Sequence, residues 1–233
     1  MNTLVSILIP VIRDRWLKEA IESALNQTYK NIEVIVCGTP DFYKICKNYP
    51  VRFIDNDEPR DNAIKAFQYA RGKYIKYLCD DDILKPTCVK DLKRGLDKEG
   101  VTLATSFREL INAEGERLPD GFNSKLGYVE KIIKGRDMLY LTMMTKFNVI
   151  GEPSTVMFRK QDVESPLSFN NIRSDIAGWV QLLTKGDLYY TPKPLSQFRQ
   201  HPGQHQWQED YRSIAYQMWD NLAQEIYNFR LGA

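Results

Sequence analysis

The feature that most constrains the fold is a series of short apolar runs in the first 80 residues. They alternate with longer segments that mix polar and apolar side chains. The runs are short enough for strands, and each is almost wholly apolar over residues 5–10, 32–36, 51–55 and 74–79. Strands that are apolar on both faces and alternate with helices indicate a mostly parallel sheet covered by helices on both sides. The fold class predicted by this pattern is therefore α/β.

Segments with helical spacing of apolar residues connect these runs. Residues 14–27 form the first such segment, with Asp14 expected as its cap, and residues 61–72 form the second, which ends at Gly72. Further along, the pattern predicts strands over 102–110 and 154–160, helices over 135–146 and 174–186, and a polar loop over 197–206. An amphipathic helix is predicted for 207–233, where apolar residues recur at positions i, i+3, i+4 and i+7.

Composition excludes several classes of protein. The chain has 233 residues, a net charge of +2 and no long basic run, so nothing favours nucleic acid as a partner. No run approaches the roughly 18 to 20 apolar residues that span a bilayer. The first apolar run is short and lacks a basic lead, which argues against a signal peptide. The 4 cysteines show no CxxC spacing, which favours reduced thiols in a cytoplasmic protein.

Three consecutive acids, Asp80, Asp81 and Asp82, follow the predicted strand over 74–79. Adjacent carboxylates repel one another, so they are either solvated, as in a turn or a helix cap near Pro86, or they face a cation. Ligands of parallel sheets bind at the carboxyl ends of strands, where this acidic triplet lies. Carboxylate oxygens suit Mg²⁺ or Mn²⁺, which commonly bridge phosphate oxygens. The residues alone leave a solvated turn and a metal–diphosphate site open.

Several segments resemble the family 2 glycosyltransferases of GT-A fold. They are VSILIPVIRDRWLKEAIESALNQTYKNIEVIV, ARGKYIKYLCDDDILKP, SDIAGWVQLL and FRQHPG, and the part SALNQTYKNIEVIV is the most specific. The resemblance extends from about Val5 to His205. It implies a Rossmann-like GT-A domain over 1–206, with a nucleotide-sugar-binding half over 1–100, an acceptor-binding half over 101–206, and a C-terminal helix over 207–233.

This resemblance identifies the acidic triplet with the DXD motif of the family, which contacts the donor's ribose and holds a divalent metal. It implies Mn²⁺ or Mg²⁺ as cofactor, with Asp82 as the most direct ligand and Asp80 and His201 as further ligands. The residues expected at the nucleotide-sugar are Pro10, Val11, Asp61, Lys65, Asp80, Asp81 and Arg199. His201 has the alternative of a plain surface-loop histidine, and Pro202 and Gly203 argue against a helical zinc pair of His201 with His205.

The resemblance also implies a catalytic base and an acceptor side. Transfer to a hydroxyl needs a base, and the family's aspartate at the start of a late helix matches Asp175 in RSDIAGW. Taken alone, Asp175 is an ordinary first-turn acid that stabilises a helix N-terminus. Glu152 and Ser154 in GEPSTVMF resemble acceptor-binding residues, although a turn leading into a strand is an equal interpretation. Trp179 is expected to pack in the core rather than to stack on a sugar.

Two departures from the family pattern fall in the nucleotide pocket. The family usually has an aspartate that recognises the base after its second strand, and this chain has Cys37 and Gly38 there. Its Asn-x-Gly pattern in the helix before the fourth strand meets Ile64 and Ala66. These departures leave the donor's base open. They also motivate an alternative function, a catalytically degenerate GT-A domain that binds a glycan or a partner without turnover.

The sequence is therefore interpreted as a metal-dependent, inverting glycosyltransferase of the hexosyltransferase type. Its expected partners are a nucleoside-diphosphate sugar, with UDP as the nucleotide, and an acceptor on a surface polysaccharide or a lipid-linked glycan. A nucleotidyltransferase is disfavoured, because IPVIRDRW contains no glycine-rich phosphate loop. The expected location is the cytoplasm, with at most peripheral association at the inner face of the membrane. The C-terminal helix is a candidate surface for a homodimer.

Overall fold

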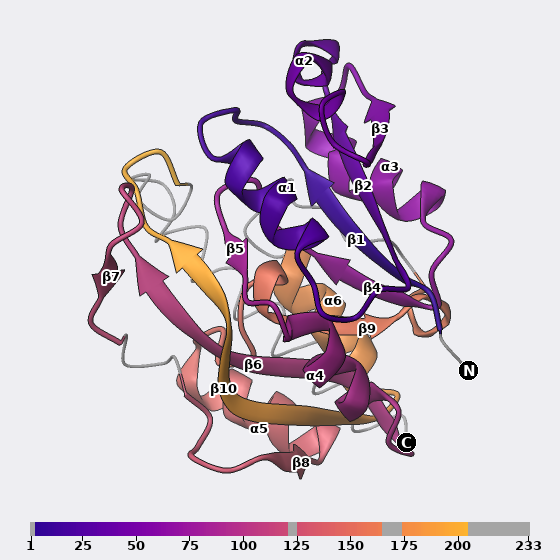
Figure 1. Cartoon of the computed structure of the whole chain (residues 1–233). Helices are drawn as coiled ribbons and strands as arrows, with labels where there is room; N and C mark the ends of the chain where they lie inside the picture. The colour runs from indigo at the N-terminus through magenta and orange to yellow at the C-terminus, as the bar shows by residue number, and fades with distance from the viewer. Residues whose placement is uncertain (1–2, 121–124, 165–173, 205–233) are drawn as a thin grey trace.

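The computed structural model of the protein describes residues 3–120, 125–164 and 174–204. One mixed sheet runs through it, with the strand order β3-β2-β1-β4-β9-β6-β10-β5 (Figure 1). Two short strands lie off this path, β7 beside β6 and β8 beside β10. The strands are β1 (Val5–Pro10), β2 (Ile32–Gly38), β3 (Arg52–Asp55), β4 (Tyr74–Tyr77), β5 (Ile83–Leu84), β6 (Val101–Ile111), β7 (Arg117–Leu118), β8 (Lys131–Ile133), β9 (Met157–Arg159) and β10 (Asp187–Arg199).

Helices cover both faces of the sheet. They are α1 (Leu17–Leu25), α2 (Tyr43–Cys46), α3 (Asn62–Tyr69), α4 (Cys88–Leu96), α5 (Gly135–Thr145) and α6 (Ser174–Leu183), with short 3₁₀ turns η1 (Pro40–Phe42), η2 (Pro59–Asp61), η3 (Pro153–Thr155) and η4 (Lys160–Asp162). Within the residues that the structure describes, no helix is long and apolar enough to cross a membrane. The predicted helix over 207–233 lies outside the described residues.

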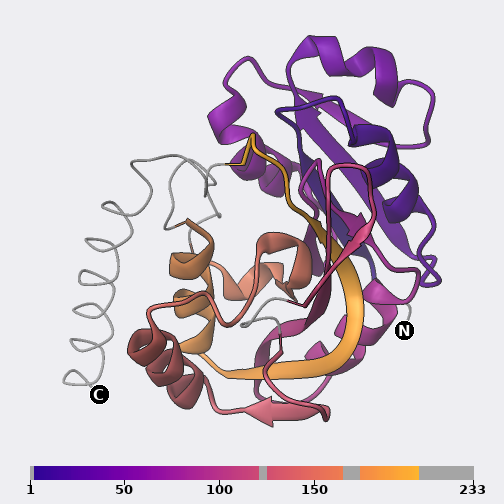
Figure 2. The same ribbon diagram turned by 90° about the vertical axis from the view of Figure 1, so that its left-hand side faces the viewer.

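Of the four predicted apolar strands, β1, β2 and β4 are mostly buried, as the sequence predicts, whereas β3 at the edge of the sheet has no buried residue. Side chains alternate across β1, so Leu8 packs with Phe67 of α3 and Trp179 of α6, whereas Ile9 packs with Ile21 of α1 on the opposite face. Trp179 is fully buried, which confirms its predicted place in the core. The helices α5 and α6 lie together on the α3 side, and α4 lies on the α1 side (Figure 2).

Strand directions decide where a site can form. β3, β2, β1 and β4 are mutually parallel, and β6 is parallel to β10. Because β9 is antiparallel to both β4 and β6, the two parallel groups point the same way. The carboxyl ends of β1, β2, β4, β6 and β10 therefore lie along one edge of the sheet, which is the usual ligand-binding edge of α/β folds. This arrangement confirms the predicted α/β class.

The longest strand, β10, is the main correction to the sequence prediction. A polar loop was expected over 197–206, but β10 extends to Arg199 and pairs with β6 along its length. Its register shifts between Thr191 and Ser196, where Pro194 cannot donate a ladder hydrogen bond. Because of these register shifts and polar residues, the sequence of β10 lacks the regular alternation of apolar and polar residues that predicts a strand. β10 is also strongly curved (Figure 2).

Helix ends differ from the prediction as well. Asp14 does not cap α1, because the N-cap residue is Trp16 and no side chain caps it. Asp14 instead contributes its backbone carbonyl, which accepts a hydrogen bond from Leu17 N at 3.2 Å. α3 ends at Tyr69, before the expected Gly72. The strand predicted over 154–160 is only β9, because η3 precedes it.

Candidate active site

The loops after β1, β4 and β10 meet at the carboxyl edge of the sheet. The loop after β4 carries the acidic triplet, and Asp80, Asp81 and Asp82 are only 2%, 4% and 1% exposed. A solvated turn is therefore wrong for these residues. Three buried carboxylates need hydrogen-bond donors or cations to offset the loss of water.

Asp80 is held by the loop that follows β1. Its Oδ2 accepts hydrogen bonds from Ile12 N at 2.7 Å and Arg13 N at 2.8 Å. Its Oδ1 pairs with Arg13 Nη2 at 3.1 Å. Burial raises the pKa of Asp80, and the charge of Arg13 and the two backbone donors oppose this rise. Asp80 thus fixes the β1 loop to the β4 loop, and both its oxygens have partners inside the protein.

Asp81 joins the β10 loop to the same cluster. Its Oδ2 lies 3.0 Å from Arg13 Nη2 and 3.0 Å from His201 Nε2. His201 Nδ1 accepts a hydrogen bond from Gly203 N at 3.2 Å, so the ring proton belongs on Nε2, which donates to Asp81. The ring of His201 also packs against Trp16, with ring centroids 4.5 Å apart. His201 is therefore a buried hydrogen-bond donor to the triplet in this structure, and the surface-loop alternative is wrong.

Asp82 differs from its two neighbours, because one of its oxygens is fully buried without a hydrogen-bond partner among the described residues. Oδ1 accepts a hydrogen bond from Arg199 N at 2.9 Å. Oδ2 is buried and forms no hydrogen bond of normal geometry among the described residues, although the Ser154 hydroxyl lowers the pKa of Asp82 by stabilising its ionised form. Burial, and then the charge of Asp81, raise the pKa of Asp82 well above its ordinary value. A buried carboxylate oxygen without a donor is the position in this cluster that a cation would satisfy.

Arg199 lies under the triplet rather than in an open loop. Its side chain is 1% exposed. Nε donates to the Asp81 carbonyl at 2.8 Å, Nη1 to the Ala113 carbonyl at 3.1 Å, and Nη2 to Glu19 Oε2 at 2.7 Å. The guanidinium also stacks on Trp16, 5.2 Å from its ring centroid. All these donors bond other groups of the protein. Arg199, which was predicted to contact a phosphate, therefore stabilises the loop of the triplet in this structure.

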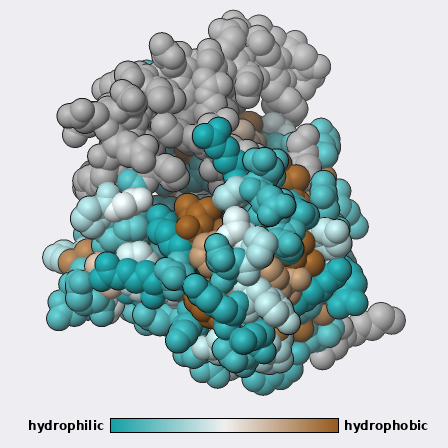
Figure 3. Space-filling model, turned by 90° about the horizontal axis from the view of Figure 1, so that it is seen from above, coloured by the Kyte–Doolittle hydropathy of each residue, from teal (hydrophilic) through white to brown (hydrophobic). Residues whose placement is uncertain are grey.

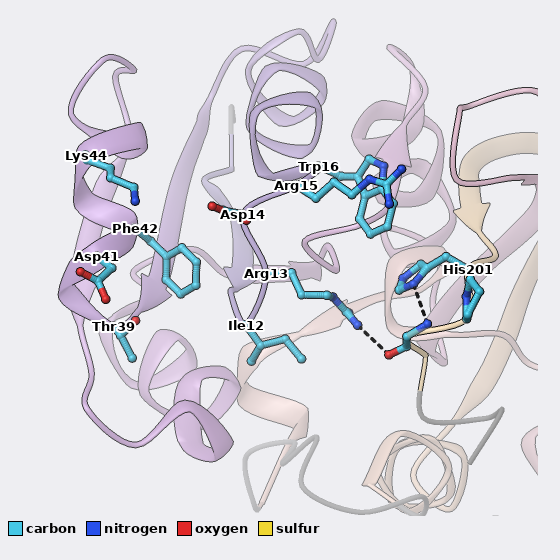
Figure 4. Close-up of a pocket in the computed structure, with 12 residues that line it drawn as sticks. Ile12, Arg13, Asp14, Arg15, Trp16, Thr39, Asp41, Phe42, Lys44 and His201 are labelled. Atoms are coloured by element: carbon cyan, nitrogen blue, oxygen red, sulfur yellow. Dashed lines mark hydrogen bonds between the residues drawn. The ribbon is translucent and has the colours of Figure 1, made fainter. Parts of the chain in front are cut away.

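A cavity of about 920 Å³ opens beside the cluster. Its walls come from three segments, the β1 loop, the residues after β2 and the β10 loop, as Figure 4 shows. Arg13, Trp16 and His201 line one side, and Phe42 and Lys44 line the other. Figure 3 looks onto this end of the molecule, where most described side chains are hydrophilic. The cavity is large enough for a nucleotide, which has the size of ordinary small-molecule ligands.

Two of the expected nucleotide residues, Val11 after β1 and Lys65 in α3, are joined through Asn62 and Asn56. Val11 is buried, and its carbonyl accepts a hydrogen bond from Asn62 Nδ2 at 2.7 Å. Asn56 Nδ2 donates to Asn62 Oδ1 at 2.8 Å, and Lys65 Nζ donates to Asn56 Oδ1 at 3.2 Å. Pro10 ends β1 directly before Val11, and Asp61 lies at the exposed start of α3. This network joins the ends of β1 and β3.

The first departure from the family pattern, at the end of β2, leaves little room for a side chain at position 38. A Cβ added to Gly38 would lie 2.8 Å from Phe42 Cδ2 and 3.2 Å from Val11 Cβ. Phe42 therefore fills the space in which a side chain at position 38 would lie. Burial raises the pKa of Cys37 to about 11, so this thiol is protonated at neutral pH and does not replace an aspartate as a charge.

Asp175 lies in the first turn of α6. Its Oδ2 accepts a hydrogen bond from Asn148 Nδ2 at 2.9 Å, and its Oδ1 accepts one from Ile176 N at 2.7 Å. Burial raises the pKa of Asp175 to about 7, and the charge of Glu152 adds to the rise. An ordinary helix-stabilising acid has a lowered pKa, so this environment is typical of a group that exchanges a proton near neutral pH.

The segment with Glu152 and Ser154 lies between the triplet and Asp175. The negative charge of Glu152 raises the pKa of both Asp82 and Asp175, so it acts on both groups. Glu152 itself pairs with Arg108, with Oε2 and Nε 2.5 Å apart. Ser154 is buried, and its Oγ accepts a hydrogen bond from Cys79 N at 2.9 Å. The alternative of a turn before a strand is correct for the backbone, which forms η3 here.

A fully buried lysine anchors this segment. Lys76 Nζ donates to the Ser154 carbonyl at 2.5 Å and to the Tyr77 carbonyl at 3.0 Å, and its pKa is lowered by burial. It connects β4, which precedes the triplet, to η3, which carries Ser154. Lys76 thus fixes η3, which carries Ser154, relative to β4 and the triplet that follows it.

A family model, described as glycosyl transferase family 2, matches residues 6–160, about two thirds of the chain. This chain belongs to glycosyltransferase family 2. The predicted family and enzyme class, a glycosyltransferase, are confirmed. The finer predictions, of the donor, the metal and the acceptor, are not decided by membership of the family.

Two curated relatives and one solved structure give this glycosyltransferase its context. An uncharacterized glycosyltransferase of Rickettsia felis is 28% identical over 213 residues, 85% of this chain and 33% of the relative. Chondroitin synthase of Escherichia coli is 29% identical over 157 residues, 61% of this chain and 22% of the relative. The chain thus spans about a fifth to a third of the length of these relatives. The crystal structure of S. aureus TarS 1-349 in complex with UDP-GlcNAc has a TM-score of 0.68 at 13% identity, covering 99% of this chain and 73% of that chain, which confirms the GT-A fold.

One group of side chains among the described residues of this glycosyltransferase could hold a metal. It consists of Cys79, Asp81 and Asp82, whose ligand atoms lie within 4.8 Å of one another. The unpartnered Asp82 oxygen suits a hard divalent cation, whereas burial raises the pKa of the Cys79 thiol and makes it a poor ligand. Asp82 is the one expected ligand in this group, because Asp80 is bonded to the β1 loop and His201 to Asp81.

The sequence prediction missed three residues that organise the site: Arg13, Asn62 and Asn148. Arg13 had a signal, because a charged residue directly after a buried parallel strand lies at the ligand edge. Asn62 had a weaker signal as an amide in the first turn of a helix. Asn148 lies in an irregular segment 27 residues before Asp175, and no local pattern reveals that they pair.

Proposed function

We propose that this chain is the donor-binding and catalytic domain, over residues 1–206, of an inverting glycosyltransferase that depends on a divalent cation. Residues 1–100 supply most of the donor side and 101–206 the acceptor side. It transfers a sugar from a nucleoside diphosphate to an acceptor hydroxyl. The observation that carries the proposal is the buried Asp82 Oδ2, which has no partner among the described residues and lies at the carboxyl edge of a family 2 fold.

The donor side is built around the triplet and the neighbouring cavity. Asp82 and Asp81 would hold Mn²⁺ or Mg²⁺, which supplies positive charge to the diphosphate as the sugar–phosphate bond breaks. Asp80, which is bound to the β1 loop, positions that loop against the phosphates. Pro10, Val11, Asp61 and Lys65 are proposed to lie near the nucleoside, and none of these four residues is among those that line the cavity. The complex of TarS with UDP-GlcNAc supports a UDP-sugar as the donor.

The acceptor side uses Asp175 as the base. With a pKa of about 7, a substantial fraction of Asp175 is ionised at neutral pH and still basic enough to accept a proton. The acceptor oxygen gives its proton to Asp175 and forms the bond to the anomeric carbon, while the nucleoside diphosphate leaves with the bonding electron pair. This single displacement inverts the anomeric centre. Glu152 and Ser154 are proposed to border the acceptor.

The acceptor is proposed to be a growing polysaccharide or a lipid-linked glycan. The similarity to a chondroitin synthase, over 61% of this chain, supports a polysaccharide product. Such polymers are made where nucleotide-sugars are available, so we propose a cytoplasmic domain that works at the inner face of the membrane. The segment 207–233 is proposed to dock against this domain or a second copy of it.

The first experiment measures thermal unfolding with UDP, GDP, CDP and dTDP, each with and without Mn²⁺. A ligand that binds the native state alone raises the midpoint according to RT ln(1 + [L]/Kd). We expect a rise with UDP that requires Mn²⁺. A transfer assay with UDP-GlcNAc then follows, with the anomeric configuration of the product read by NMR.

The outcomes separate the proposal from its main alternative. Metal-dependent UDP binding with transfer and inversion would support the proposed enzyme. Binding of UDP with no transfer to any chondroitin-type or lipid-linked acceptor would favour a degenerate binding domain. No rise with any nucleotide would refute the proposed donor site.

A further inference from the structure

The β1 loop places a permanent cation on the acidic triplet. Arg13 Nη2 lies 3.1 Å from Asp80 Oδ1 and 3.0 Å from Asp81 Oδ2. Within the part of the chain that the structure describes, Arg13 is the one arginine or lysine that forms an ion pair with these acids. Its side chain is 29% exposed, and it lines the cavity (Figure 4).

This position conflicts with a divalent cation. Asp81 belongs to the group that could hold a metal, and its Oδ2 already accepts from both Arg13 and His201. A cation bound through Asp81 and Asp82 would lie close to the guanidinium, and like charges repel strongly in a buried site. The two cations therefore favour different arrangements of the same carboxylates.

Arg13 is also incompletely satisfied where it lies. Its Nε is buried and has no hydrogen-bond partner among the described residues. Its Nη1 makes only a long contact, 3.4 Å, with the Gly203 carbonyl (Figure 4). A guanidinium that turned toward the cavity could instead donate to phosphate oxygens in the paired geometry that arginine prefers.

We propose that Arg13 is an internal counterion of the acidic triplet, which neutralises Asp80 and Asp81 before loading and competes with the divalent cation for them. When the cation binds, the Arg13 side chain leaves the carboxylates and turns toward the donor's phosphates. Arg13 therefore sets how tightly the site holds a metal. This inference rests on the proposed function, because it requires that the triplet binds a divalent cation.

The test is calorimetric titration of Mn²⁺ alone into the wild-type chain, Arg13→Ala, Arg13→Gln and Arg15→Ala. Removal of the competing ion pair is expected to lower the Kd for Mn²⁺ by about tenfold in both Arg13 variants, in line with the strength of charge-assisted pairs. Arg15 is the matched control, because it lies in the same loop but pairs with the exposed Glu114 at 3.7 Å. Its variant should bind Mn²⁺ as the wild type does.

A second readout is the unfolding midpoint. Without metal, the Arg13 variants should unfold at a lower temperature than the wild type, because Asp80 and Asp81 lose their counterion. Saturating Mn²⁺ should raise their midpoint by more than it raises that of the wild type. Arg13→Gln keeps a long polar side chain, so it gives the result if Arg13→Ala does not fold.

The outcomes distinguish this inference from the proposed function. Unchanged or weaker Mn²⁺ binding in both Arg13 variants, while Asp82→Asn abolishes binding, would overturn the counterion and leave the metal site intact. Mn²⁺ binding by the Arg13 variants but not by the wild type would support the counterion in its strongest form. No binding by any variant would overturn both the counterion and the metal site, and transfer from UDP-GlcNAc in EDTA would then show whether the transferase function stands.

Discussion

This glycosyltransferase has two regions of buried acids, and the groups that surround the acids differ between them. The acids of the proposed donor side, Asp80, Asp81 and Asp82, contact backbone donors, Arg13 and His201. The acceptor-side acid, Asp175, has Asn148 and its own helix as donors, and the charge that acts on it most is the negative charge of Glu152. On the proposed donor side the charge of Arg13 opposes the rise in the pKa of Asp80 that burial causes, whereas on the proposed acceptor side the charge of Glu152 adds to the rise in the pKa of Asp175.

Glu152 connects the two regions, since it raises the pKa of both Asp82 and Asp175. The two regions therefore differ in their electrostatics as well as in their location. Adding positive charge on the donor side should stabilise the ionised triplet, whereas the proton on Asp175 should respond chiefly to its own burial. The variants below test this difference.

The largest effect is expected for Asp82→Asn, which removes the unpartnered charge on the donor side. Loss of a ligand oxygen should abolish Mn²⁺-dependent UDP binding and lower the transfer rate by about 1000-fold, because the diphosphate then lacks its cation. The free protein should keep its unfolding midpoint, since a neutral amide is easier to bury than a carboxylate. Calorimetry with UDP and Mn²⁺ measures the first effect.

The control for this variant is Asp97→Asn, whose carboxylate bonds Lys93 and Tyr74 at the end of α4, away from the triplet. It should bind UDP as the wild type does. Metal-dependent binding that survived in Asp82→Asn would remove the main distinction between the two acidic regions.

On the acceptor side, Asp175→Asn should keep donor binding and lose transfer. A positioned base contributes about 100- to 10,000-fold to a rate, so kcat should fall by that order while the Kd for UDP stays constant. Asp137→Asn is the matched control, because Asp137 is also a first-turn acid, in α5. If both variants transferred sugar at the normal rate, Asp175 would be an ordinary helix-stabilising acid.

A third variant, Arg199→Lys, tests how firmly the donor side is supported. The guanidinium reaches the Asp81 carbonyl, the Ala113 carbonyl and Glu19, and a lysine ammonium cannot span these positions. We expect a loss of about 3 kcal/mol in the free energy of unfolding, measured in urea. Arg94→Lys, at a half-exposed arginine paired with Glu130, should change stability by less than about 1 kcal/mol. A loss of UDP affinity in Arg199→Lys at unchanged stability would instead indicate the direct phosphate contact predicted from sequence.

The sequence predicted the first half of the fold well, because its signals are local. The runs at β1, β2 and β4 are almost wholly apolar, and most of their residues are buried. The second half was harder, because β10 is interrupted by prolines and shifts register against β6. A strand that is irregular along its own length has no simple alternation to detect.

The same distinction holds for the site. The types of residue at Asp80–Asp82 and Asp175 were predicted, because motifs are local. Their partners were not, since Asp80 meets Arg13 across 67 residues and Val11 meets Asn62 across 51. The free oxygen of Asp82 is likewise a property of the packed structure. Contacts between distant segments decide which acid has a counterion, and the local patterns of a single sequence do not reveal them.

A smaller effect concerns the pH dependence of stability. The folded pKa of Asp175 is raised from 3.8 to about 7, so the folded protein holds this proton more tightly than the unfolded chain does. The resulting stability is fully present below about pH 4 and is lost as the pH rises through 7. The Asp175→Asn variant has no such proton to lose. Its free energy of unfolding, relative to that of the wild type, should therefore rise by about 1–2 kcal/mol between pH 4 and pH 8, after allowance for partial exposure.

Unfolding of both chains across this pH range measures the difference directly, because contributions from the donor-side acids cancel. The transfer rate of the wild type should rise over the upper part of the same range, as Asp175 becomes ionised. A stability difference that stayed constant from pH 4 to pH 8 would contradict the raised pKa. It would also remove the proposed difference between Asp175 and the acidic triplet in how readily each exchanges a proton.

The smallest effect is expected at the β2 end of the donor side, from Gly38→Ala. The new Cβ would lie 2.8 Å from Phe42 Cδ2, and Phe42 lines the cavity, so the ring must move to make room. Because the nearest atom belongs to a side-chain ring, and Val11 Cβ at 3.2 Å and the Val11 carbonyl at 3.3 Å need only small shifts, the cost should be about 1 kcal/mol in the free energy of unfolding. The double variant Gly38→Ala with Phe42→Leu should recover most of this lost stability, as neighbouring residues do not act additively.

A normal stability but a changed preference among UDP, GDP, CDP and dTDP would show that Phe42, rather than an acid at position 38, forms the wall against the base. Unchanged stability and unchanged preference would place this end of the cavity outside the donor side, which would then reduce to the triplet and the β1 loop.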